Sequence, residues 1–192
     1  MSDTYADHID TAFLQLSFAI KLWHYLDVHA IEKNEFDIPL TIEDPGNRVC
    51  LRGNEFKTYQ DLQLAAENNI SICFGALAIT LWEAIREHSG LSSGKLNPQN
   101  SPKENLAALS YMIRCCFAHG TASPVWSIRD AKYKTVYWVG NKTIDLARIA
   151  DKQPFDYSSV GGYETLWLLK AEAVAIGLLC ITNGKGRRIL WC

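Results

Sequence analysis

The chain lacks the excess of positive charge that marks proteins binding duplex nucleic acid over a whole surface, because its formal net charge is −2. Any contact with RNA must therefore be local. It also lacks a run of the roughly 18 apolar residues that a membrane span needs. Its first eight residues, MSDTYADH, are polar and acidic, unlike a signal peptide. These absences predict a cytoplasmic protein of 192 residues that does not enter a membrane.

Paired cysteines and closely spaced metal ligands are lacking as well. The chain has six cysteines, and none forms a C-x-x-C pair. They are Cys50, Cys73, Cys115, Cys116, Cys180 and Cys192. His24 and His29 are five residues apart, whereas a helical zinc pair favours i and i+4. We therefore expect reduced thiols, no metal and no cofactor.

Apolar periodicity is what the chain has in abundance. Steps of three and four residues predict four helices, at about 4–29, 58–88, 102–119 and 163–182. In the first helix Phe13 and Leu16 begin one stripe, and Leu14 and Phe18 begin a second beside it. Two stripes predict a wide buried face and more than one packing neighbour.

Two segments alternate apolar and polar residues around turn sequences and predict β-hairpins, within about 36–52 and 125–147. The second is expected to have a strand at 133–139. The fold class is thus mainly α: one domain, 1–192, built as a bundle of about four helices with two hairpin insertions.

The third helix is expected to begin with a capping box at Ser101 and Glu104 and to end near Gly120. Tyr111, Cys115 and His119 follow one another at i, i+4 and i+8, so they share a face. Arg114 is roughly 140° from His119 around the axis, but its long guanidinium can reach the same cleft. In the simplest structural interpretation, Arg114 pairs with a carboxylate and His119 only ends the helix.

Residues 113–120, Ile-Arg-Cys-Cys-Phe-Ala-His-Gly, resemble the R-x4–6-H motif of HEPN domains, which include metal-independent endoribonucleases and toxins. The resemblance implies that Arg114 and His119 are the catalytic pair, with Tyr111 and Cys115 as supporting residues. It also implies a homodimer with two motifs face to face, cleavage of single-stranded RNA to 2′,3′-cyclic phosphate ends, and an antitoxin protein as a possible partner. The family usually has a polar residue, often asparagine, where this chain has Cys115.

A basic and aromatic cluster lies in the predicted second hairpin region. Interleaved residues of this kind can stack single-stranded bases and neutralise phosphates, or the aromatic rings can pack the hairpin onto the helices. The basic members are Arg129, Lys132 and Lys134, and the aromatic members are Trp126, Tyr133 and Trp138. A second short basic segment lies at 184–188.

Other functions stay open at this point. Cys115 favours a non-catalytic HEPN-like module that binds a nucleotide or RNA, or a protein-interaction module. A thiol nucleophile at Cys115 beside His119 is a further alternative, but no third group that would orient them is evident.

Overall fold

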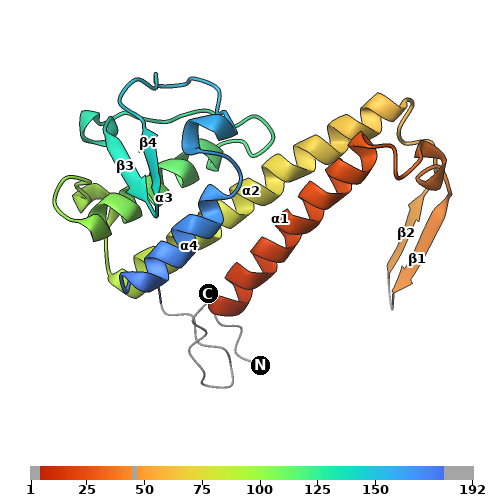
Figure 1. Ribbon diagram of the computed structural model, residues 1–192. Helices are drawn as coiled ribbons and strands as arrows, with labels where there is room; N and C mark the ends of the chain where they lie inside the picture. Colours follow the sequence, from red (N-terminus) through yellow and green to blue (C-terminus); the bar gives the residue numbers. More distant parts are fainter. Residues whose placement is uncertain (1–4, 45–46, 180–192) are drawn as a thin grey trace.

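The computed structural model describes residues 5–44 and 47–179 and is mainly helical, which confirms the predicted fold class (Figure 1). Four α-helices form the described structure: α1 (Tyr5–Asp27), α2 (Tyr59–Ser89), α3 (Pro102–Phe117) and α4 (Thr165–Ala175). The basic segment at 184–188, Cys180 and Cys192 lie outside the described residues. The four other cysteines are free thiols, as expected.

The central element is α2, against which α1, α3 and α4 all pack. Its first turn is fixed by a capping box in which Thr58 Oγ1 accepts from Asp61 N at 3.1 Å and Asp61 Oδ2 accepts from Thr58 N at 2.9 Å. Gly90 ends the helix with φ of +67°. In length and composition α2 is apolar enough to cross a membrane, yet its apolar stripe from Ile70 to Ile85 is buried in the core of the bundle, and the core helix of a soluble protein has the same length and composition.

Helix α1 buries its first predicted stripe, but it buries the second only toward the end of the helix, where Leu26 is in the core and Leu22 is partly buried. Phe13 and Leu16 are in the core, and α1 lies along α2 and touches α4 through the Phe13 and Trp167 rings, whose centroids are 5.0 Å apart. Leu14 and Phe18 are exposed. The prediction of a wide buried face was therefore wrong for these two residues, because no second neighbour within the described chain covers them.

Both predicted hairpins are present as antiparallel pairs. Their strands are β1 (Leu40–Asp44), β2 (Asn47–Leu51), β3 (Val136–Val139) and β4 (Lys142–Asp145). The strand predicted at 133–139 begins three residues later, because Ala131–Tyr133 form a 3₁₀ turn that Asp130 caps. Tyr137 and Val139 point into the core and Trp138 outward, as the alternation requires.

The last helix is shorter than predicted. Helix α4 begins at Thr165, whose hydroxyl bonds to Val160 O, and it ends at Ala175. Gly177 has φ of +70°, a conformation that stops the helix before the predicted limit at 182. Residues 180–182 lie outside the described residues.

The start of α3 was predicted in part. Ser101 is the N-cap and its Oγ accepts from Glu104 N at 3.2 Å. The reciprocal half of the capping box is absent, because the Glu104 carboxylate instead accepts from Asn97 N at 2.8 Å and from the side chain of Asn100. Glu104 thereby fixes the loop before α3.

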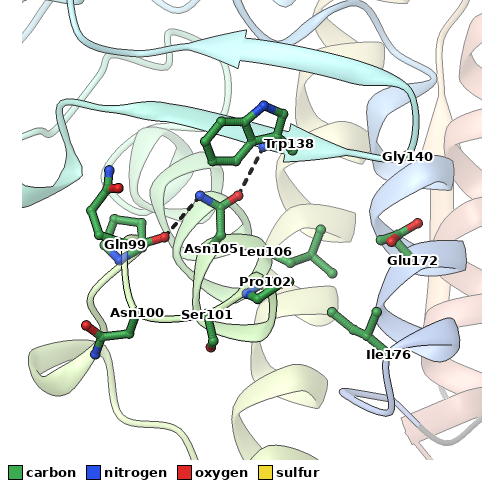
Figure 2. A pocket seen from close by; sticks show the side chains of 11 residues that line it. Gln99, Asn100, Ser101, Pro102, Asn105, Leu106, Trp138, Gly140, Glu172 and Ile176 are labelled. Carbon is green, nitrogen blue, oxygen red and sulfur yellow. Dashed lines mark hydrogen bonds between the residues drawn. The ribbon is translucent and has the colours of Figure 1, made fainter.

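Asn105 joins α3 to the free edge of β3 (Figure 2). Its Oδ1 accepts from Trp138 N at 3.0 Å, while its Nδ2 donates to Val136 O at 3.4 Å and to Pro98 O at 3.2 Å. The buried amide thus supplies the two bonds that a neighbouring strand would make to β3. The second hairpin is thereby held against the helix that carries the motif.

We expect Asn105→Ala to lower the free energy of unfolding by about 1–3 kcal/mol, because Trp138 N and Val136 O, which are part-buried, lose their bonds to the Asn105 amide. Gln99→Ala is the matched control: Gln99 is exposed and its side chain donates to Thr135 Oγ1, so the loss of this side chain should cost less than about 0.5 kcal/mol. Urea unfolding followed by circular dichroism measures both. Equal stability of the two variants would show that the amide does not hold the hairpin.

Candidate functional site

The motif at the end of α3 divides its residues between the core and the surface. Ile113, Cys116 and Phe117 are buried, and Phe117 lies so close to Gly75 of α2 that a Cβ there would be 2.6 Å from its ring. Four of the remaining five residues, Arg114, Cys115, Ala118 and His119, line one surface cleft, and Gly120 does not. The core residues therefore fix the helix end, and the cleft residues are free for chemistry.

The cleft has a volume of about 260 Å³ and brings Arg114, His119, Tyr111 and Cys115 together, as their spacing predicted. Its opposite wall comes from the segment that follows the helix. The lining residues of that wall are Ser127, Arg129, Asp130 and Tyr133.

The opposite wall is held in place by bonds to a segment more than twenty residues later in the chain. Trp126 N donates to Gln153 O at 2.8 Å, and Lys152 N donates to Trp126 O at 2.7 Å. Ile128 N donates to Asp151 Oδ1 at 3.0 Å. These long-range bonds direct residues 127–130 toward α3. No local sequence pattern predicts the bonds.

Helix α3 ends earlier than predicted. Ala118 is the C-cap, so His119 follows the helix and does not belong to its last turn. His119 is exposed and lines the cleft. Gly120 does not adopt the left-handed conformation expected of a C′ glycine, so that prediction was wrong.

Arg114 is half-buried, and its Nε is buried without a hydrogen-bond partner among the described residues. Asp130, the carboxylate that lines the cleft, pairs with Lys132 at 3.5 Å, and Glu83 of α2 pairs with Arg86. Within residues 5–44 and 47–179, no ion pair neutralises Arg114. This arrangement disfavours the interpretation that Arg114 only pairs with a carboxylate, because a buried N–H is costly unless a ligand or a water molecule bonds to it.

Tyr111 and Tyr133 form the aromatic side of the cleft. The Tyr111 ring lies between Trp82 and Tyr133, with centroid distances of 5.1 Å and 5.8 Å, and Tyr133 Oη donates to Ser93 O at 2.7 Å. Burial raises the pKa of both phenols above the ordinary tyrosine value, and neighbouring Cys115 adds to the shift. Both rings are therefore uncharged at neutral pH and cannot act as bases there.

The basic cluster proposed from sequence does not form one surface with the cleft. Arg129 lines the cleft, but Lys132 Nζ lies 5.0 Å from the centre of the Tyr133 ring and pairs with Asp130. Lys134 is exposed and is not part of the cleft wall. Trp126 is fully buried, so it packs the core and cannot stack a base.

The charge of the cleft therefore comes from two guanidinium groups, one imidazole and one carboxylate. Asp130 already forms an ion pair with Lys132, so the remaining charge in the cleft is positive and favours binding of an anion. A phosphodiester between Arg114 and Arg129 would meet this charge, and His119 lies at the same site to move a proton.

A larger hollow of about 530 Å³ lies between the loop before α3, the second hairpin and α4 (Figure 2). It includes Asn105, Trp138 and Glu172 and contains no arginine, lysine or histidine. It therefore offers no charge for a phosphate, and the smaller cleft is the candidate site.

In the part of the chain that the structure describes, no group of three histidine, cysteine, aspartate or glutamate side chains is placed to hold a metal ion. The chain was compared with models of protein families, with curated proteins and with solved structures, and none of the three comparisons gave a match. The cleft and the motif that lines it are therefore the features of this protein that bear on its function.

Proposed function

We propose that this chain is a metal-independent endoribonuclease of the HEPN type, acting in the cytoplasm on single-stranded RNA through Arg114 and His119. The observation that carries the proposal is the meeting of these two side chains with Arg129 in one surface cleft, where Arg114 has a buried nitrogen without a partner among the described residues. A toxin or defence role, with an antitoxin protein as partner, follows from the resemblance of the motif.

The chemistry needs only groups that the cleft and the RNA supply. The ribose 2′-oxygen attacks the adjacent phosphorus, the bond to the 5′-oxygen breaks, and the 2′-proton is finally transferred to that leaving oxygen. His119 takes or gives this proton. Arg114 stabilises the extra negative charge on the phosphoryl oxygens in the transition state. The products are a 2′,3′-cyclic phosphate and a 5′-hydroxyl.

A homodimer with two motifs across a twofold axis would complete this mechanism. One histidine cannot be the base and the acid in the same concerted step, so the partner's His119 would supply the second proton transfer. Exposure of His119, which lines the cleft, is compatible with such an approach.

The proposal is tested by incubating the purified protein with single-stranded RNA in excess EDTA and following the RNA length by electrophoresis. Cutting that EDTA does not suppress supports the proposal. Binding without cutting would instead support the non-catalytic RNA-binding module, and neither binding nor cutting would leave only a protein-interaction role.

Cys115→Asn is expected to raise the cleavage rate several-fold. Cys115 lies one helical turn before His119 in the cleft, where an amide can hold the imidazole and a thiol is a weak donor and acceptor. Cys73→Asn is the control, because Cys73 is a half-buried thiol on α2 outside the cleft. An unchanged rate in Cys115→Asn would show that the cysteine does not limit catalysis.

A further inference from the structure

The hollow of about 530 Å³ between the loop before α3, the second hairpin and α4 takes no part in the proposed RNA chemistry. Its volume is that of a small-molecule site, for which about 300–1,000 Å³ is typical. Figure 2 shows that Pro102 and Leu106 of α3 lie in the middle of the lining, with Gln99 on one side and Glu172 on the other. A hollow of this size, with an apolar centre and a few polar groups around it, can hold one small organic molecule.

Trp138 supplies an open aromatic surface at this hollow. It is 56% exposed, because the alternation along β3 points its side chain outward. Its backbone N is fixed by the bond to Asn105 Oδ1 at 3.0 Å. The indole is therefore held at a defined place without being part of the core, and it can cover the hydrocarbon part of a ligand.

Glu172 is the charged side chain among the described residues that line the hollow. It is partly buried, and within residues 5–44 and 47–179 its carboxylate forms no hydrogen bond or ion pair. Lys103, exposed in the first turn of α3, forms no ion pair with it; Lys103 Nζ lies 3.9 Å from the place that a Cβ on Gly177 would take. A partly buried carboxylate without a protein partner is available to a cationic donor on a ligand.

The beginning of α3 at the edge of the hollow does not make the hollow an anion site. Helix N-termini attract anions through free backbone N–H groups. Here Ser101 Oγ already accepts from Glu104 N at 3.2 Å, and Pro102 has no N–H. The Glu104 carboxylate is also close by, where it accepts from Asn97 N at 2.8 Å. Two carboxylates, those of Glu104 and Glu172, therefore favour a cation at this place.

We propose that this hollow binds a small organic cation, an alkylguanidinium or alkylammonium. The charged group pairs with the Glu172 carboxylate. The hydrocarbon chain lies on Leu106, Ile176 and the Trp138 indole. A neutral molecule of the same shape would leave the carboxylate without a partner. The inference does not depend on the proposed function, because none of the residues that line the hollow lines the Arg114 cleft.

A titration of the full chain with n-butylguanidinium, and with n-butylurea, which has the same shape and no charge, tests the proposal. The reporter is the Trp138 indole N–H signal in NMR spectra; the chain has six tryptophans, so this signal is assigned by its loss in Trp138→Phe. n-Butylguanidinium should shift the signal saturably with a dissociation constant of about 1 mM, and n-butylurea should bind about tenfold more weakly. No saturable shift up to about 20 mM, or equal affinity of the two compounds, would overturn the proposal.

Glu172→Gln tests which residue supplies the charge. This variant keeps the shape of the side chain and removes its charge, so n-butylguanidinium should bind about tenfold more weakly and no better than n-butylurea. Glu87→Gln is the matched control: Glu87 is an exposed carboxylate near the end of α2, outside the hollow, so both dissociation constants should stay at their wild-type values. A preference for the cation that survives in Glu172→Gln would overturn the proposal.

Discussion

Arg114→Ala and His119→Ala should each lower the rate of RNA cleavage by at least about a hundredfold, because each removes a group that acts on the same transition state. Arg114 supplies charge to the phosphoryl oxygens, and His119 moves the proton between the 2′- and 5′-oxygens. The double variant should be little worse than either single variant, since groups that act together are not additive. Cleavage is followed with one RNA substrate under single-turnover conditions.

The control variants replace an arginine and a histidine at positions outside the cleft. Arg148 and His88 are exposed and lie outside the cleft, so alanine at either position should leave the rate within about twofold of wild type. Cleavage that survives in His119→Ala, or that falls equally in His88→Ala, would contradict the assignment of the site.

Leu77→Ala is expected to destabilise the protein by about 2–5 kcal/mol, because it opens a cavity in the central packing of α2. Leu77 has no exposed surface and belongs to the main core, where the surrounding helices limit how far the structure can relax. Denaturant unfolding gives the difference directly, provided that the slope of the transition is unchanged.

The same measurement separates scaffold from site. His119 is exposed, so His119→Ala should change the melting temperature by only a few degrees while it abolishes cleavage. If Leu77→Ala and His119→Ala lost stability equally, His119 would be a structural residue and its effect on activity would say nothing of catalysis.

Local sequence signals predicted the helices and the helical side of the cleft well. The stripe from Ile70 to Ile85 repeats with a helical period and is buried. Thr58 at the start of α2 is a favourable N-cap, and Tyr111 and Cys115 face one cleft because i and i+4 lie on one side of a helix. His119 lines the same cleft from just past the end of α3.

The parts that the sequence did not predict depend on contacts distant along the chain. Asp130 and Tyr133 join the cleft only because residues 126–128 bond to residues 151–153. Nothing in the sequence distinguishes Asn105 from other residues of its helix. Its role depends on β3, which lies beside it and bonds to its amide. Periodicity alone shows that Leu14 and Phe18 lie on one face of α1, but not whether that face meets the chain's own core or another molecule.

The central claim, that Arg114 and His119 direct the attack of a ribose 2′-hydroxyl, is tested most directly by the chemical nature of the new RNA ends. Mass spectrometry of the products formed in excess EDTA should show a 2′,3′-cyclic phosphate on one fragment and a 5′-hydroxyl on the other. An otherwise identical oligonucleotide without 2′-hydroxyl groups should stay intact. A 3′-hydroxyl with a 5′-phosphate, or cutting of the substrate that lacks 2′-hydroxyl groups, would contradict the account.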